Sequence, residues 1–334
     1  DYEPFVKMTK KESDVLLVVR DNTTMTTTPP SPRLTPSQFN HNAILSSLNH
    51  HGYCILENYI PTPITSTLQQ EFTKILASTP TGRNRFEGAF TKRAYNLFNK
   101  TRAFDNLVTD PFLLNIIEEI LQSEHYLLSS TVGISIGSNS DKQPPHRDDG
   151  KYPINRPHNE LVMNMIVAID DFTEENGGTV LYPGSHKWIY QGENDYVTRN
   201  VIPNELELTP IHKNEQSIHD TIPQLKMNSS ISCVMPAGSI MLYRGSLLHG
   251  GGANSSVQPR CGVLIEFIQA WLRPQENHLL GVDIQKVCQL PTKLQELLGY
   301  TVSPPFIGYV DGRHPKRLLE RLKVVKENQK ISKL

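Results

Sequence analysis

The sequence predicts a single, mainly β domain with flanking helices, built as an antiparallel barrel or jelly roll. From residue 126 onward the chain carries many short strand-like segments, separated by turn signals such as Asn176-Gly-Gly and Pro183-Gly. No helical segments alternate with these strands, which argues against a βαβ fold. Several of the 24 prolines stand at segment edges, as is typical of a loop-rich β protein.

The front third of the chain is predicted to be mostly helical. Thr35-Pro-Ser-Gln predicts the start of a helix, because a capping residue and a first-turn proline precede apolar residues at helical spacing. Residues 61–77 and 111–121 repeat apolar side chains at the same spacing, and 52–56 form a short β candidate. A further helical region is expected around residues 279–298.

The strand pattern sets the expected domain limits. Residues 1–34 are polar and rich in Thr and Pro, and predict a flexible N-terminal arm. One domain should span residues 35–315, with its jelly-roll core at about 125–272, an irregular polar insertion at about 189–228, and a basic tail at 316–334. The predicted core strands are 126–128, 131–136, 161–169, 178–182, 231–235, 239–243 and 262–268.

Bulk composition excludes several classes of protein. The 334 residues carry a nearly balanced charge, with a net value of −1, so nothing indicates a nucleic-acid partner. No apolar run approaches the length of a membrane span. The four cysteines form no C-x-x-C pair, which argues against a zinc ribbon or a thioredoxin motif and favours free thiols.

A candidate metal site begins at His146 and Asp148. They stand two positions apart, so in an extended segment both side chains leave the same face. An imidazole and a carboxylate on one face are two thirds of the 2-His-1-carboxylate site of non-haem iron oxygenases. The same parity favours Asp148 over its rival Asp149, which would point to the other face, and makes Arg147 a structural residue.

The third ligand is predicted to be His249, which follows a strand and precedes three glycines that let the backbone turn sharply. Arg260 stands eleven residues later, at the start of an apolar strand. An arginine there can grip a carboxylate with two parallel hydrogen bonds, which a lysine cannot. The open face of the metal would then accept a keto acid and oxygen.

These features together resemble the phytanoyl-CoA dioxygenase family of Fe(II)/2-oxoglutarate oxygenases. The matching stretches are residues 146–150, the long segment 168–188 with its D-D-F-T-E-E-N-G and P-G-S-H motifs, and Pro236-Ala-Gly-Ser leading to the distal histidine. The resemblance covers roughly residues 36–315 and implies a double-stranded β-helix, the cupin-like jelly roll. It also implies His146, Asp148 and His249 as iron ligands, and Arg260 as the partner of the distal 2-oxoglutarate carboxylate.

Family position suggests further contacts. Thr179 and Asn164 are expected to touch the cosubstrate, although a strand threonine and a buried polar residue on a sheet are equally good interpretations. Gln143, close to the ligand pair, is expected at the cosubstrate site, and Tyr95 on the wall of the substrate pocket. One departure is Gly251, which stands where some members carry a hydroxyl residue that contacts the cosubstrate.

The resemblance implies oxidation of a C–H bond, by default hydroxylation, with release of succinate and carbon dioxide. Since halogenating relatives replace the metal aspartate by a small residue, Asp148 favours oxygenation over halogenation. The expected substrate is small and hydrophobic, such as a fatty acyl-CoA or a terpenoid-type natural product. Two alternatives remain: a non-catalytic protein that binds metal and a carboxylate, favoured by Gly251, and a zinc hydrolase on the same scaffold.

The chain closes with Ser332-Lys333-Leu334, which is a peroxisomal import address when it forms a C-terminus. The sequence therefore predicts an import receptor as a partner and a peroxisomal location, with a cytoplasmic location otherwise. Such a location would suit a lipid or acyl-CoA substrate without establishing one.

Overall fold

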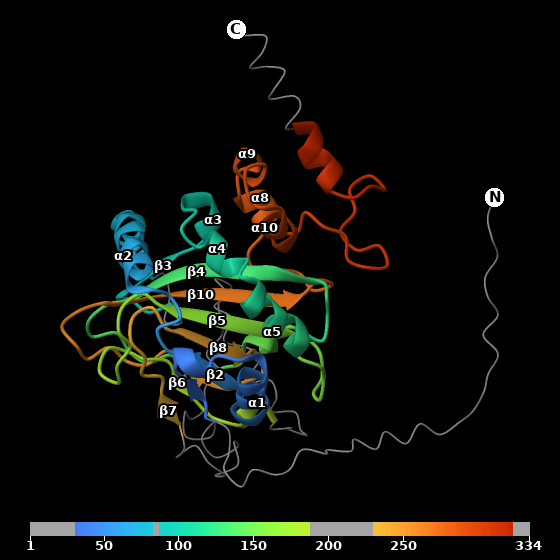
Figure 1. Ribbon diagram of the computed structural model, residues 1–334. Coiled ribbons are helices and arrows are strands. Elements are labelled where there is room, and N and C mark those ends of the chain that lie inside the picture. The colour runs from blue at the N-terminus through green and yellow to red at the C-terminus, as the bar shows by residue number, and fades with distance from the viewer. Residues whose placement is uncertain (1–30, 83–86, 188–229, 323–334) are drawn as a thin grey trace, which may run out of the picture.

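The computed structural model describes residues 31–82, 87–187 and 230–322. Two sheets form the domain, one of seven strands and one of three, as expected for a double-stranded β-helix (Figure 1). The large sheet contains, in spatial order, β1 (Arg33–Leu34), β2 (Tyr53–Leu56), β8 (Ile240–Arg244), β5 (Val162–Ala168), β10 (Arg260–Gln269), β4 (Tyr126–Ile136) and β3 (Thr91–Ala94). The small sheet contains β7 (Ile231–Ser232), β6 (Val180–Leu181) and β9 (His249–Gly250).

Helices cover the outer face of the large sheet (Figure 1). The main hydrophobic core lies between them and the strands, and its largest helical contribution comes from α5 (Pro111–Leu121), while α2 (Thr62–Ala77) adds Leu68 and Phe72. A glycine allows close packing at one point, because a Cβ at Gly133 would lie 2.1 Å from the ring of Phe72. The other helices are α1 (His41–His51), α3 (Leu97–Lys100), α4 (Asp105–Val108), α8 (His278–Gly281), α9 (Ile284–Val287) and α10 (Thr292–Leu297).

The first helix starts later than predicted. Residues Pro36–Gln38 form only a turn of 3₁₀ helix, and α1 begins at His41. The reason is a better cap, since the side chain of Asn40 accepts a hydrogen bond from the Ala43 amide at 2.9 Å. The helix ends at Gly52, whose φ of 86° requires the left-handed conformation that glycine adopts readily.

Several strands differ from the predicted ones. The segments 126–128 and 131–136 form one continuous strand, β4, which pairs with β10 along its whole length apart from a bulge. The segments 178–182 and 231–235 shrink to the two-residue strands β6 and β7. The short strands β1, β3 and β9 were not predicted, because two to four residues carry too little periodicity to stand out.

The limits of the arm, insertion and tail are only partly described. Arg33 and Leu34 pair with β2 in the large sheet, so the prediction that the arm extends to residue 34 was wrong for these two residues. Residues 1–30, the insertion at about 189–228 and the terminal Ser-Lys-Leu lie outside the described residues. In the tail, residues 316–322 are helical.

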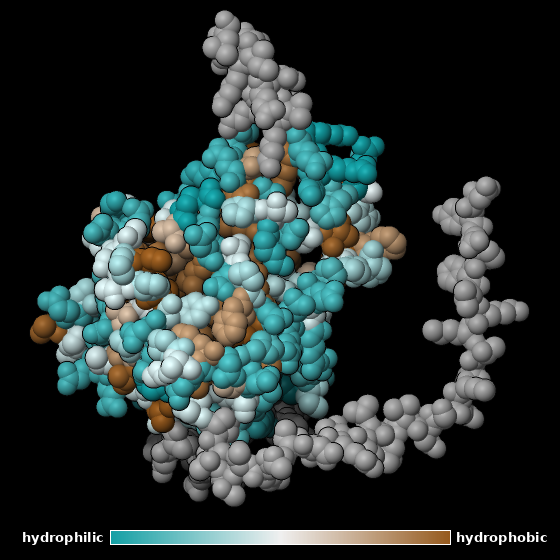
Figure 2. All heavy atoms as spheres, viewed as in Figure 1, coloured by the Kyte–Doolittle hydropathy of each residue, from teal (hydrophilic) through white to brown (hydrophobic). Residues whose placement is uncertain are grey.

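The predicted helical region at 279–298 is three short helices, α8, α9 and α10. The breaks have local causes: Asp283 caps α9 through a bond from the Gln285 amide at 2.7 Å, and Pro291 immediately precedes α10. Among the described helices, none combines the length and the apolar composition needed to cross a bilayer. Figure 2 shows a mainly hydrophilic face on which the apolar patches are separated from one another.

His278 in α8 makes stability depend on pH. It is 2% exposed, and burial lowers the pKa of its imidazole from 6.5 to about 4. As pH falls below 6.5, the unfolded chain binds a proton at this imidazole, whereas the folded protein binds it only near pH 4. The contribution of His278 to the free energy of unfolding is therefore complete above pH 6.5 and is lost as pH falls from 6.5 to about 4. We expect the free energy of unfolding, measured by urea titration, to fall less steeply between pH 6.5 and pH 4 in His278→Leu than in the parent protein. The control His125→Gln, at an exposed site, should leave this pH dependence unchanged. An unaltered slope in His278→Leu contradicts this prediction.

Candidate active site

Backbone pairing brings the two predicted histidines together from distant parts of the chain. His146 and His249 exchange both backbone hydrogen bonds, at 2.8 and 3.0 Å, in an antiparallel bridge. His249 lies on β9, which pairs with β6 in the small sheet. The segment leading to His146 therefore acts as a further short piece of strand against β9, and the imidazole rings stand 4.5 Å apart between centroids.

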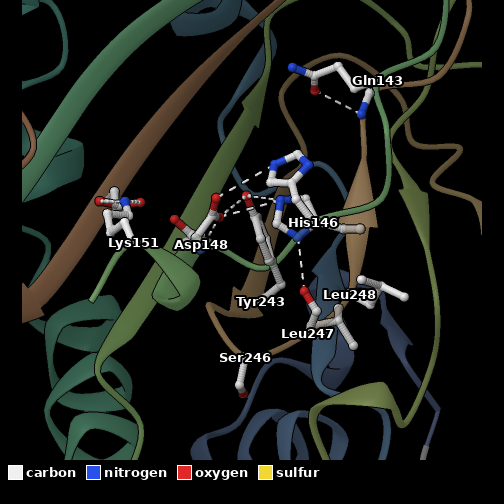
Figure 3. Close-up of polar contacts among 12 residues, drawn as sticks. Gln143, His146, Asp148, Lys151, Tyr243, Ser246, Leu247 and Leu248 are labelled. Atoms are coloured by element: carbon white, nitrogen blue, oxygen red, sulfur yellow. Dashed lines mark hydrogen bonds and ion pairs between the residues drawn. The ribbon is translucent and has the colours of Figure 1, made fainter. Parts of the chain in front are cut away.

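Asp148 completes a cluster whose ligand atoms all lie within 4.8 Å of one another. One carboxylate oxygen, Oδ1, is 3.8 Å from Nε2 of His146, and the other, Oδ2, is 3.4 Å from Nε2 of His249. Figure 3 shows the His146 and Asp148 side chains pointing toward one another above the Tyr243 ring. No other set of three or more acidic, histidine or cysteine side chains in the described part of the chain meets in this way.

The backbone orients both imidazoles for metal binding. Nδ1 of His146 lies 3.0 Å from the Pro144 carbonyl oxygen, and Nδ1 of His249 lies 3.0 Å from that of Leu247. Since a carbonyl oxygen can only accept, each Nδ1 carries the proton and donates it there. Each Nε2 is left with a lone pair directed into the cluster, as a metal ligand requires.

The parity argument correctly separated the two adjacent carboxylates. Arg147 is extended, with φ −120° and ψ 136°, so His146 and Asp148 project to one side. Asp148 opens the 3₁₀ turn η2 (Asp148–Lys151) and faces the histidines, whereas buried Asp149 pairs with Arg156 on the other side. Arg147 donates to the Ser185 carbonyl at 2.9 Å, consistent with the predicted structural role.

The site's electrostatics favour a bound cation. Burial, together with the neighbouring His249, lowers the pKa of His146 to about 4, so its ring stays neutral. Burial alone would raise the pKa of Asp148, but the two histidines outweigh it and lower the pKa, so the carboxylate stays ionised. Imidazole nitrogens and one carboxylate are the donor set that suits a divalent metal such as iron, and the residues present therefore fit one.

Arg260 is a buried cation without an acidic partner among the residues that the structure describes. It is 4% exposed, stacks on the Phe172 ring at 3.9 Å, and donates to the Gly177 carbonyl. Its Nε has no hydrogen-bond partner within the described ranges. Burial lowers the pKa of Arg260 to about 10, which still leaves the guanidinium charged at neutral pH. A buried, unpaired guanidinium fits a ligand carboxylate such as that of 2-oxoglutarate.

Arg93 is a cation of the site that sequence reasoning missed. It lies on β3 opposite Ile134 of β4, and Arg260 lies opposite Ile136, so both arginines share the inner face of the large sheet. The charge of Arg93 contributes to lowering the pKa of both His146 and Arg260, so it is near each of them. Strand alternation in residues 91–94 could have indicated it, had this short strand been recognised.

Gln143 occupies the place left open by Gly251. Its backbone N–H donates to the Gly251 carbonyl at 2.8 Å, and its side-chain Oε1 accepts from the Gly251 amide at 3.0 Å (Figure 3). A Cβ at Gly251 would lie 2.8 Å from that Oε1, so the two positions are sterically complementary. The lack of a hydroxyl side chain at Gly251 was the only feature that favoured a non-catalytic protein. The side chain of Gln143 lies at this position instead.

The remaining predicted residues lie as follows. Asn164 is fully buried and donates to Oδ2 of Asp148 at 2.9 Å, so its side chain contacts the metal carboxylate. Thr179 is buried just before β6, and its carbonyl accepts from the Cys233 amide. Tyr95 is 37% exposed, and its hydroxyl donates to Glu87 at 3.0 Å. Cosubstrate contacts for Asn164 and Thr179, and a pocket position for Tyr95, stay predictions.

Comparison with known sequences points to one family. A family model described as phytanoyl-CoA dioxygenase (PhyH) matches residues 48–262. "Dioxygenase olcK" of Penicillium canescens is 29% identical over 250 residues, which cover 71% of this chain and 73% of that protein. "Dioxygenase FUM3" of Gibberella moniliformis is 27% identical over 269 residues, covering 75% of this chain and 79% of that protein.

Solved structures with the same fold carry a metal and a keto acid. The epimerase SnoN, in complex with Fe³⁺, alpha ketoglutarate and nogalamycin RO, matches with a TM-score of 0.53 at 17% identity, covering 72% of this chain and 88% of that one. HygX from Streptomyces hygroscopicus, with nickel, 2-oxoglutarate and hygromycin B bound, matches with a TM-score of 0.51 at 13% identity, covering 69% and 88%. At these identities the likeness concerns the fold.

Proposed function

The chain belongs to the phytanoyl-CoA dioxygenase family and is an Fe(II)- and 2-oxoglutarate-dependent dioxygenase; from this premise we propose that it hydroxylates a C–H bond of a small hydrophobic natural product. The observation that carries the proposal is the convergence of the His146, Asp148 and His249 ligand atoms beside the inner sheet face that also carries the buried guanidinium of Arg260.

The chain's own residues have separable tasks in this reaction. The Nε2 atoms of His146 and His249 and the carboxylate of Asp148 would hold the iron on one side, leaving the other side for ligands. Arg260 would bind the far carboxylate of 2-oxoglutarate, which turns the cosubstrate toward the metal. Iron and 2-oxoglutarate, when bound, supply the oxidising chemistry with oxygen and release succinate and carbon dioxide. The protein orients the reactants and excludes bulk water.

Two kinds of substrate fit the expectation of a small hydrophobic molecule. Support for a natural product comes from the neighbouring structure of SnoN, which was solved with nogalamycin RO. A fatty acyl-CoA is the second candidate, because the terminal Ser332-Lys333-Leu334 would place the enzyme among peroxisomal lipids. Retention of Asp148 supports hydroxylation over halogenation as the outcome.

The first test is an anaerobic titration of the purified protein with Fe(II) and then 2-oxoglutarate, followed by the visible charge-transfer band of the chelate. The band should require His146 and weaken in Arg260→Ala. Substrate panels of terpenoids and of acyl-CoA esters are then screened by succinate release, with product analysed by mass spectrometry. Bound metal without a band, or activity that needs zinc and no oxygen, would overturn the proposal.

Delivery to peroxisomes is a separate part of the proposal, and it holds if Leu334 ends the chain in the cell. We expect a fluorescent protein fused in front of the full chain to collect in peroxisomes marked by a resident protein. Deleting Leu334 should disperse it, because the import receptor reads the terminal tripeptide together with its carboxylate. Diffuse fluorescence of the full-length fusion would contradict this location.

A further inference from the structure

Three polar side chains form a row across the inner face of the large sheet. Glu266 on β10 lies opposite Asn164 on β5, which lies opposite Tyr243 on β8, and each is at most 1% exposed. We call these three residues the polar row. Two positions further along the same strands, the face is apolar, with Leu264, Ile166 and Met241 in register. Polar groups buried on such a wall require partners.

The partners come from the turn that carries the metal carboxylate. Side chains three residues apart in a 3₁₀ helix are eclipsed, so Asp148 and Lys151 of η2 project to the same side. Lys151 binds both oxygens of Glu266, at 2.7 and 2.6 Å. Figure 3 shows Lys151 beside Asp148, on the side away from His146. Two side chains of the turn therefore contact the polar row: Lys151 binds Glu266, and Asp148 accepts hydrogen bonds from the other two members.

The hydrogen bonds to Asp148 are unevenly shared between its two oxygens. Oδ2 accepts from the Asn164 amide at 2.9 Å and from the Tyr243 hydroxyl at 3.3 Å. Within the described residues, Oδ1 receives no hydrogen bond and lies 3.8 Å from Nε2 of His146, whereas Oδ2 also lies 3.4 Å from Nε2 of His249. The two donors on Oδ2 therefore hold the carboxylate in one orientation.

The Lys151–Glu266 ion pair reinforces that arrangement. Burial alone would lower the pKa of Lys151, but Glu266 and Asp148 raise it, so the ammonium is charged. Lys151 also donates to Gln275 at 3.0 Å, which satisfies a further proton of the ammonium. Buried pairs of this kind contribute little net stability, so a role in positioning accounts for one so near the metal carboxylate.

We propose that the polar row and Lys151 are positioning residues, which fix η2 and the Asp148 rotamer and so hold the carboxylate in the orientation in which it meets the metal. Glu266 and Lys151 act through the turn, whereas Asn164 and Tyr243 act on Oδ2 itself. The inference deepens the proposed function, on which it rests only for the presence of a divalent metal at the triad. Outer partners of metal ligands orient them and tune affinity in this manner.

The test compares two variants with a matched control. Tyr243→Phe removes only the hydroxyl, and the double variant Lys151→Met/Glu266→Gln removes both charges together, so that neither is left buried alone. Tyr59→Phe is the control, because its hydroxyl donates to the carboxylate of Asp110 at 2.9 Å, at a helix cap outside the metal site. Lys151→Arg keeps the cation and serves as the conservative variant.

Each protein is titrated with Co(II) in the absence of 2-oxoglutarate, and its d–d absorption bands and thermal unfolding are recorded. We expect Tyr243→Phe and the double variant to bind Co(II) about 10- to 100-fold more weakly, as for other outer partners of metal ligands. Their bands should also shift, because the carboxylate is no longer held in one orientation. Tyr59→Phe should match the parent protein, and Lys151→Arg should retain most of the affinity.

The outcomes separate this inference from the proposed function. Unchanged Co(II) affinity and bands in Tyr243→Phe and the double variant overturn the positioning role, even if their melting temperatures fall, because a purely structural role predicts that combination. If the parent protein binds no Co(II) that depends on His146, the metal site itself fails, and the proposed function fails with it. A shift confined to the two variants, with the control unchanged, supports the inference.

Discussion

Replacing Asp148 by Asn is expected to abolish turnover, whereas the same substitution at the adjacent Asp149 leaves it in place. Asp148 supplies the only carboxylate of the triad, and an amide is a much weaker ligand. Because even outer partners of metal ligands are worth 10- to 100-fold in affinity, we expect Asp148→Asn to weaken iron binding by more than about 100-fold. Anaerobic Fe(II) titration and succinate release, measured on the same preparations, check this.

Asp149→Asn is the matched control, since it removes a neighbouring carboxylate with identical chemistry. Asp149 is 1% exposed and pairs with Arg156, with His158 at 3.7 Å. Its loss leaves Arg156 without its partner and should destabilise the protein by about 3 kcal/mol, as for other broken buried pairs. Iron affinity should stay close to that of the parent. If Asp149→Asn loses iron and Asp148→Asn keeps it, the assignment of the carboxylate ligand is wrong.

Replacing Arg260 by Met should cost about 100-fold in affinity for 2-oxoglutarate while sparing affinity for iron. The substitution removes two charge-assisted hydrogen bonds to the far carboxylate of 2-oxoglutarate. Their loss should cost about 3 kcal/mol of binding free energy, which corresponds to about 100-fold in affinity. Arg260→Lys should fall in between, because it keeps the charge but loses the planar fork. The measurement is the 2-oxoglutarate titration of the chelate band at saturating Fe(II).

The same substitution should stabilise the protein when no 2-oxoglutarate is present. The guanidinium is buried with an unpartnered Nε, and no carboxylate of the described residues forms an ion pair with it, although the charge of Asp170 reaches it. Removing an unpaired buried charge relieves its desolvation cost, so the melting temperature of Arg260→Met should rise above that of the parent. Added 2-oxoglutarate should then raise the melting temperature of the parent but not of the variant. Equal stabilisation of both would show that Arg260 does not hold the cosubstrate.

Local patterns in the chain were enough to predict the main helices and the three residues that meet in the candidate metal site. The amphipathic repeats of α2 and α5 are local, and the structure confirms both helices within a residue or two. The choice of Asp148 over Asp149 needed only the extended conformation of the intervening Arg147. The short strands β3 and β9 were not predicted from the sequence, because pairing with neighbouring strands stabilises them more than the β propensity of their own residues does.

The sequence by itself indicated the candidate residues for the chemistry: two histidines, one aspartate and an arginine, each recognisable from its local motif. Only the tertiary structure decided how they are held. The His146–His249 bridge, the approach of Arg93 and the support of Asp148 by Tyr243 all join segments far apart in the chain. Such contacts are set by sheet register and by the burial of polar groups against specific partners, and neither leaves a periodic signal in the sequence.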